Sequence, residues 1–161
     1  MSERFVRLGV DVGDARVGIA RSDLDGLIAT PVRTLPRAEA ARELQSLMFE
    51  ERAERIYVGL PRSLAGHEGA AAEKARAFVE ELVALEPLEG EGEYEVFFVD
   101  ERLTTVDAHR ALSASGRKTR THRSVVDQVA AVMILQTALE TERGRGTAAG
   151  EPWTPMPTIK E

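Results

Sequence analysis

The sequence predicts a single α/β domain built on a mixed sheet of five strands, with helices packed against the sheet. Its first third alternates apolar and polar residues with a period of two and is broken by glycine turns, which is typical of antiparallel strands. From residue 38 onwards, helix-like segments alternate with short apolar runs, and strands joined by a helical crossover are normally parallel. We therefore expect three antiparallel strands, followed by two strands parallel to the first.

The three antiparallel strands are expected in the first 32 residues. Residues 6–12 alternate apolar positions with Arg7, Gly9 and Asp11, and Gly13-Asp14 provides a turn. A returning strand is expected around residues 17–20. After a second turn at Gly26, residues 27–32 form the third strand, which Pro31 places at an edge or a strand end.

The remaining elements alternate between helices and strands. Helical segments are rich in Ala, Glu, Arg and Leu at helical spacing, whereas the strands are short apolar runs. The expected helices are 38–55, 68–85, 105–114 and 125–142, and the expected strands are 56–60 and 95–99.

Composition limits the class of protein. The 161 residues suit one domain, which we place at 1–143, and the glycines and prolines of 144–161 predict a flexible or loosely docked tail. There is no cysteine, which excludes disulfides and thiolate metal sites. The N-terminus carries no signal-peptide pattern and the longest aliphatic run is residues 129–135, so we expect a cytoplasmic protein with no membrane partner.

Three acidic sites fall on or beside predicted buried structure. Asp11 interrupts an apolar strand between glycines, Asp100-Glu101 directly follow another strand, and Asp127 shares a helical stripe with small residues. Each also has an ordinary explanation: a hydrogen-bonded turn at Asp11, solvated loop residues at 100–101, and a capping box between Ser124 and Asp127. Together they predict an all-oxygen metal site, which suits two Mg²⁺ or Mn²⁺ ions acting on a phosphate.

The motifs resemble those of one known family. The strings Gly9-Val10-Asp11-Val12-Gly13 and Arg16–Asp23 are similar to the start of the YqgF/RuvX family of RNase H-like nucleases. Gly59-Leu60-Pro61, Asp100–Thr105 and Ala130–Gln136 are similar to its later blocks, and the Asp-Glu-Arg-Leu-Thr-Thr string is highly specific. The resemblance covers about residues 5–140. The loop at residues 62–69 departs from it, because many relatives carry Asp or Asn just before the first glycine.

The resemblance implies an RNase H-like fold and a catalytic, metal-binding triad of Asp11, Glu101 and Asp127. Gly13, Thr104 and Thr105 lie in the matching motifs and are expected to support that site. The family is described as processing pre-16S rRNA or resolving Holliday junctions.

Basic residues lie close to the acidic ones in sequence. Although the net charge is −6, residues 73–101 hold ten acids and two bases, whereas residues 102–123 hold six bases and one acid. In isolation an ordinary solvated loop is the favoured explanation of the second segment. Beside the acidic triad, the segment predicts contacts to a nucleic-acid backbone. The expected nucleic-acid-binding residues are Arg16, Arg102, Arg117, Lys118, Arg120 and Arg123.

The function expected from the sequence is a nuclease that hydrolyses phosphodiester bonds with Mg²⁺ or Mn²⁺, acting on the 5′ end of pre-16S rRNA. The first alternative is a Holliday-junction resolvase acting on branched DNA, which would be expected to form a homodimer. A non-catalytic nucleic-acid-binding protein on the same fold is the second, and a sugar-kinase-like phosphotransferase is disfavoured by chain length. The roles of His67 and of the segment around Trp153 stay open.

Overall fold

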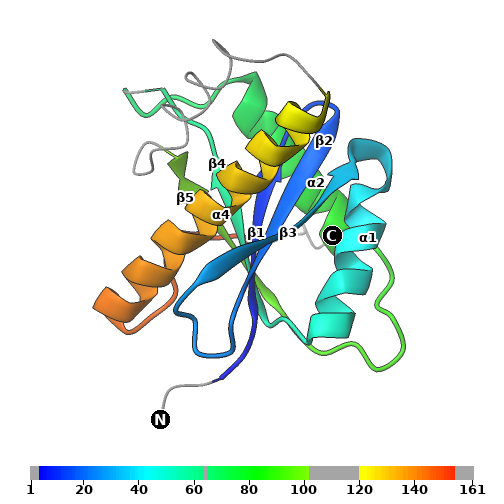
Figure 1. The fold of residues 1–161 in the computed structure, drawn as a ribbon, viewed down its shortest axis with the longest axis vertical. Coiled ribbons are helices and arrows are strands. Elements are labelled where there is room, and N and C mark those ends of the chain that lie inside the picture. The colour runs from blue at the N-terminus through cyan, green and yellow to red at the C-terminus, as the bar shows by residue number, and fades with distance from the viewer. Residues whose placement is uncertain (1–3, 64, 102–119, 155–161) are drawn as a thin grey trace, which may run out of the picture.

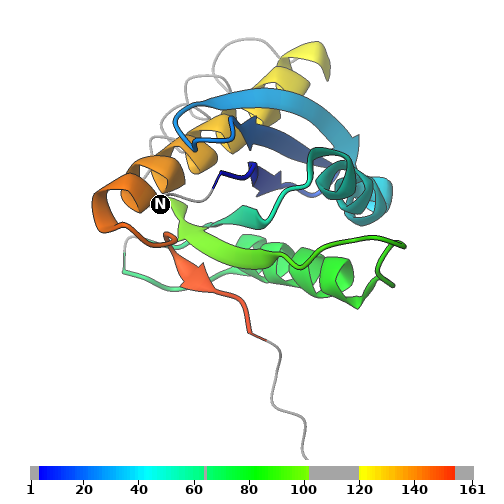
Figure 2. The ribbon, with the colours of Figure 1, turned by 90° about the horizontal axis from the view of Figure 1, so that it is seen from below.

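The computed structural model describes the backbone of residues 4–63, 65–101 and 120–154, and the side chains of these residues except those of 120–127. In this part of the chain, six strands form one mixed sheet in the order β3-β2-β1-β4-β5-β6. Helix α4 crosses one face of the sheet, and α1 and α2 cover the other face (Figures 1 and 2). The α/β fold with a mixed, helix-flanked sheet is therefore as predicted.

The first three strands are antiparallel, as expected. β1 (Arg7–Val12) pairs with β2 (Arg16–Ser22), and β2 pairs with β3 (Ala29–Pro36). β3 continues to Pro36 rather than ending at residue 32. Pro31 does not stop it because β3 is an edge strand, where a missing N–H can face away from the ladder.

The next two strands run parallel to β1, also as expected. β4 (Arg55–Leu60) lies between β1 and β5 (Glu95–Asp100) and pairs in parallel with both. The sixth strand, β6 (Glu151–Pro152), pairs antiparallel with β5, so the predicted count of five strands is wrong. A strand of two residues in a glycine- and proline-rich segment has no periodicity from which it could be predicted.

The described helices differ from the predicted ranges at their ends. α1 (Arg37–Glu51) stops earlier than expected because Arg52 adopts a left-handed conformation with φ 53°. This helix end could not be predicted, because the left-handed position is occupied by an arginine and not by a glycine. α2 (Ala70–Ala84) is close to its predicted range. α4 (Arg120–Arg145) starts five residues earlier and ends three residues later than expected. None of the described helices is long and apolar enough to cross a membrane, and the predicted helix 105–114 lies outside the described residues.

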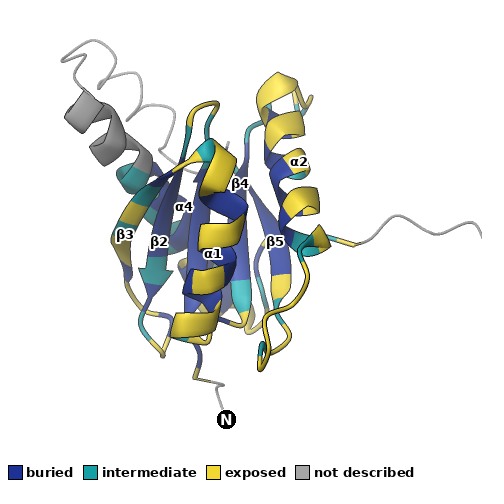
Figure 3. Ribbon diagram, turned by 90° about the vertical axis from the view of Figure 1, so that its right-hand side faces the viewer, coloured by how far each residue is buried: buried dark blue, intermediate teal, exposed yellow. Residues whose placement is uncertain are grey.

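The two faces of the sheet form two separate cores. Val10, Val58 and Phe98 point towards α1 and α2, whereas Tyr57 and Val99 point towards α4. β2, β4 and β5 are mostly buried, the edge strand β3 is largely exposed, and the outer surfaces of α1 and α2 are exposed (Figure 3). The odd-numbered positions of β1, β4 and β5 therefore lie under α4.

Glycines let α4 pack closely on this face. A Cβ built on Gly9 would lie 2.6 Å from the Leu135 Cβ and 2.8 Å from the Ala131 carbonyl oxygen. Both distances are shorter than normal contacts, and the second atom belongs to the helix backbone. The helix can therefore rest on β1 only where β1 has no side chain.

Candidate functional site

Asp11 lies on the face of the sheet that α4 covers. It is next to last in β1, and its neighbours Val10 and Val12 pack into the opposite core. Since side chains alternate along a strand, the carboxylate of Asp11 points towards α4. Only 4% of the residue is exposed. The prediction of an acidic group in a buried strand is therefore confirmed.

Glu101 reaches the same face from β5. It directly follows the last residue of β5 and is only 2% exposed. A Cβ built on Gly59 of β4 would lie 2.9 Å from Glu101 Oε1. The carboxylate of Glu101 is thus folded over the end of β4, and it is not a solvated loop residue.

Gly59 is the common neighbour of these two acids. The parallel pairing of β1 with β4 matches Val10 with Val58, which places Asp11 next to Gly59. On its other side, Gly59 pairs with Val99, two residues before Glu101. Asp11 and Glu101 therefore flank a position without a side chain, at the carboxyl end of three parallel strands. Sequence analysis identified Gly59 only as part of a family motif, although a glycine inside an apolar strand signals a close approach.

The third predicted acid is placed only through its backbone. Asp127 lies in α4, four residues before Ala131 and on the helical stripe that continues through Ile134 and Ala138, which are buried against the sheet. Its side chain lies outside the described residues. Because α4 begins at Arg120, Ser124 is not the N-cap of this helix, and the capping-box explanation of Asp127 is wrong.

The turn between β1 and β2 places Gly13 and Arg16 beside the site. The Gly13 N–H donates a hydrogen bond of 2.8 Å to the Arg16 carbonyl, and a Cβ on Gly13 would lie 2.9 Å from the same oxygen. A side chain at Gly13 would therefore open the turn. Arg16 is half-buried and begins β2, two residues before Gly18, which pairs with Asp11. Both residues thus belong to the β1–β2 hairpin that carries the predicted catalytic residue Asp11.

The other predicted binding residues are only partly described. Arg102, Thr104, Thr105, Arg117 and Lys118 lie outside the described residues. Arg120 and Arg123 fall in the first turn of α4, and their side chains are not described. The expectation that residues 120–123 belong to a loop is corrected by this helix. No glycine or proline lies between Arg120 and Arg143, and α4 continues through Gly144 to Arg145, where Gly146 follows with φ 76°.

Arg62 was not among the predicted site residues, but it contacts the base of the site. It lies just after β4, and its guanidinium is 3.6 Å from Asp100, the residue before Glu101. The same guanidinium is 3.3 Å from Glu68 and 3.0 Å from Glu151. Arg62 therefore joins the ends of β4 and β5 to β6 and to the loop that precedes α2.

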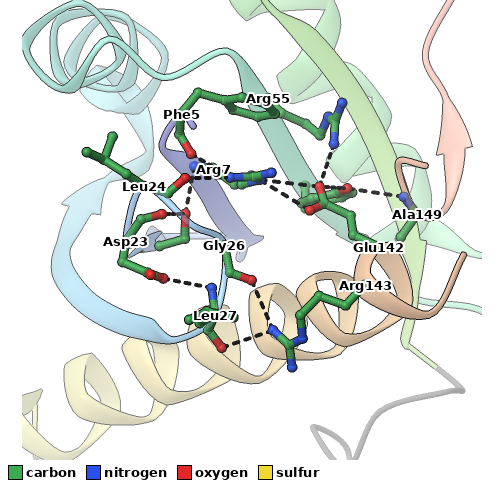
Figure 4. Close-up of polar contacts among 12 residues, drawn as sticks. Phe5, Arg7, Asp23, Leu24, Gly26, Leu27, Arg55, Glu142, Arg143 and Ala149 are labelled. Carbon is green, nitrogen blue, oxygen red and sulfur yellow. Dashed lines mark hydrogen bonds and ion pairs between the residues drawn. The ribbon is translucent and has the colours of Figure 1, made fainter. Parts of the chain in front are cut away.

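A second polar cluster holds the other end of α4. Arg7 and Arg55 converge on Glu142, with Arg7 Nε 3.2 Å and Arg55 Nη1 2.5 Å from its carboxylate (Figure 4). The Tyr57 hydroxyl donates a hydrogen bond of 2.5 Å to the same carboxylate and accepts one from the Ala149 N–H at 3.1 Å. Burial, together with this bond to Glu142, raises the pKa of Tyr57 above its usual value. The cluster ties α4 to β1 and β4, and so fixes the helix that carries Asp127.

The donor atoms of the site suit a hard divalent cation. Asp11 and Glu101 supply carboxylate oxygens from buried positions, and Mg²⁺ and Mn²⁺ prefer such ligands. Among the described residues, no three acidic or histidine side chains come together as a metal site. Because the Asp127 side chain is outside this set, its role as a third ligand stays a prediction.

The comparison with family profiles identifies the chain. The profile described as "RuvX: Holliday junction resolvase" matches residues 5–141. The chain therefore belongs to the RuvX family, which confirms the resemblance seen in its motifs.

Curated relatives and solved structures agree with this assignment. A protein of Streptomyces coelicolor named "Putative pre-16S rRNA nuclease" is 51% identical over 148 residues, which is 90% of this chain and 86% of that protein. A protein of the same name from Streptomyces avermitilis is also 51% identical, over 90% of this chain and 92% of that protein. Thermus thermophilus RuvC in complex with a Holliday junction substrate matches 92% of this chain and 99% of its own, with a TM-score of 0.55 and 13% identity. That likeness concerns the fold alone, and it confirms the RNase H-like architecture.

Proposed function

We propose that this protein is a nuclease that hydrolyses phosphodiester bonds with Mg²⁺ or Mn²⁺. The observation that carries the proposal is the pair of buried carboxylates, Asp11 and Glu101, on either side of Gly59 at the carboxyl edge of the sheet. Ligands of open α/β sheets bind at this edge. A buried carboxylate pair is costly for the fold, and binding a cation offsets that cost.

We assign the metal ligands to Asp11, Glu101 and Asp127. Asp11 in β1, Glu101 just after β5 and Asp127 in α4 would hold two such ions between them. When bound, such ions activate a water for attack and neutralise charge on the transferred phosphate. The expected products carry a 5′-phosphate and a 3′-hydroxyl.

The substrate backbone is held by basic residues around this edge. Arg16 is the first residue of β2, and Arg120 and Arg123 lie in the first turn of α4. The N-terminus of a helix attracts phosphate through its unpaired N–H groups and its dipole. Arg102, Arg117 and Lys118 belong to the same basic segment of the sequence and complete the proposed set.

The substrate we propose is the 5′ region of pre-16S rRNA. The support is the name shared by relatives that are about half identical over most of this chain. Branched DNA is the alternative, supported by the description of the family and by the likeness to RuvC in fold. A resolvase needs two sites for a symmetric cut, so the alternative predicts a homodimer. A pair of buried carboxylates argues against a protein that only binds nucleic acid, because such a protein has no use for them.

The experiment compares both substrates with matched variants. Purified protein is incubated with Mn²⁺ and either a pre-16S 5′ RNA fragment or a four-way DNA junction. We expect cleavage of the RNA by the wild type and by Asp14→Asn, and none by Asp11→Asn. Asp14 is the control because it is an acid in the same turn with an exposed side chain, paired to Lys74. Cleavage by Asp11→Asn at the wild-type rate would refute the proposed mechanism.

A further inference from the structure

A cavity lies beside the site, at the outer edge of β5. It has a volume of about 300 Å³ and is enclosed by the end of β5, the second half of α4 and the turn that leads into β6. The ladder between β5 and β6 ends at Phe98, and the cavity follows along Val99 and Asp100. Asp100 directly precedes Glu101, so the lining of the cavity ends one residue before a buried carboxylate of the site.

The walls of the cavity are held by specific contacts. Gly150 has φ +75°, and a Cβ on it would lie 2.3 Å from the Phe98 carbonyl oxygen, so only glycine lets the turn approach β5 this closely. The Ala149 N–H is fixed by the Tyr57 hydroxyl at 3.1 Å. The guanidinium of Arg62 bridges to Glu151 at 3.0 Å and closes the rim. These contacts fix the turn against β4 and β5.

The lining combines apolar walls with a few polar groups. Val99 and Ala138 are buried and face the cavity from β5 and α4. Thr137 adds a half-buried hydroxyl, and Arg145 adds an exposed cation in the last turn of α4. The Nε–H of Arg62 is buried and has no acceptor among the described residues. A flat apolar ring with polar edge atoms and an attached phosphate matches this lining.

We propose that this cavity binds one unstacked nucleotide of the substrate, next to the phosphate that is cleaved at Asp11 and Glu101. The inference rests on the proposed nuclease function and adds a substrate requirement to it. An enzyme acting on one position of a structured nucleic acid selects for nucleotides that leave the stack easily, and a pocket for the base offsets the cost of unstacking. The substrate must therefore be unpaired, or readily opened, next to the cleaved bond.

The first test measures nucleotide binding without any cleavage. Full-length wild-type protein, free of divalent ions, is titrated with each ribonucleoside 5′-monophosphate and followed by amide NMR. We expect the largest shifts at Thr137, Thr141 and Ala149. Thr137→Phe fills the cavity and should weaken binding about tenfold, within the range that base-stacking contacts contribute. Thr147→Phe, an exposed position outside the lining, should bind as the wild type does.

Two outcomes would overturn the proposal: shifts located away from the cavity, or equal binding by Thr137→Phe and Thr147→Phe. Thr141→Phe provides a second filled cavity if Thr137→Phe does not fold. Substrates with one abasic position on either side of the cleaved bond then test the catalytic role. An abasic site at one of the two positions should slow cleavage by the wild type. The same abasic site should not change the rate of cleavage by Thr137→Phe. If no substrate is cleaved at all, the nuclease proposal fails, whereas the titration still decides what the cavity binds.

Discussion

Gly59→Ala separates the packing of α4 from the chemistry of the site. The new Cβ would lie 2.5 Å from Ile134 Cδ1 and 2.9 Å from Glu101 Oε1, both inside normal contact distance. The first contact concerns packing, since Ile134 is fully buried between α4 and the sheet. The second concerns the proposed metal ligand.

The expected magnitudes follow from these two contacts. Overfilling a packed core by one methyl group costs about 1–3 kcal/mol of unfolding free energy. Ile134→Val removes the Cδ1 atom and costs about 0.5–1.5 kcal/mol in the wild-type background. In the double variant the valine makes room for the alanine, so the total loss of stability should be smaller than the sum by about 1 kcal/mol. Glu101 stays displaced in both backgrounds, and a displacement near 1 Å lowers catalytic rates by about 10²-fold.

The assay combines urea unfolding with single-turnover cleavage in Mn²⁺. Gly92→Ala is the matched control, because a Cβ there has no neighbour within 4 Å among the described residues. It should change stability by no more than about 0.5 kcal/mol and leave cleavage unchanged. Strictly additive stability losses in the double variant, or full cleavage by a folded Gly59→Ala protein, would contradict the geometry assigned to Gly59.

Two further predictions concern ion pairs that hold the fold. Glu142→Gln leaves two arginines facing a neutral group and should cost about 3–5 kcal/mol of unfolding free energy, measured in urea, the usual cost of breaking a buried pair. The control is Glu140→Gln, exposed on the same helix, which should cost at most about 0.5 kcal/mol. Equal losses in the two variants would rule out the network. The pKa of Glu68 is held below its ordinary value of 4.5 first by hydrogen bonds from Arg76, against the opposing effect of burial. This ion pair stabilises the fold above the ordinary pKa, and the contribution is lost as the pH falls through the lowered pKa. Glu68→Gln should therefore reduce the urea midpoint near neutral pH, and its difference from the wild type should shrink as the pH falls below 4.5. A pH-independent difference would contradict this.

The sequence predicted the strands and two buried carboxylates because these depend on local patterns. Asp11 stands out as an acid in an apolar strand, and Glu101 follows the last apolar run. The role of Gly59 could not be predicted, because it depends on which residue of α4 passes over β4. The Glu142 network also joins residues far apart in the sequence. One signal did exist: the stripe that holds Ala131, Ile134 and Ala138 reaches Glu142 four residues later.

The central claim is that Asp11 is a metal ligand, and Mn²⁺ binding tests it most directly. The electron paramagnetic resonance signal of free Mn²⁺ disappears as the ion binds, which reports binding in the absence of any substrate. We predict that wild-type protein and Asp14→Asn bind Mn²⁺ with the same affinity and that Asp11→Asn leaves the ion free. Equal Mn²⁺ binding by Asp11→Asn and Asp14→Asn would contradict the account.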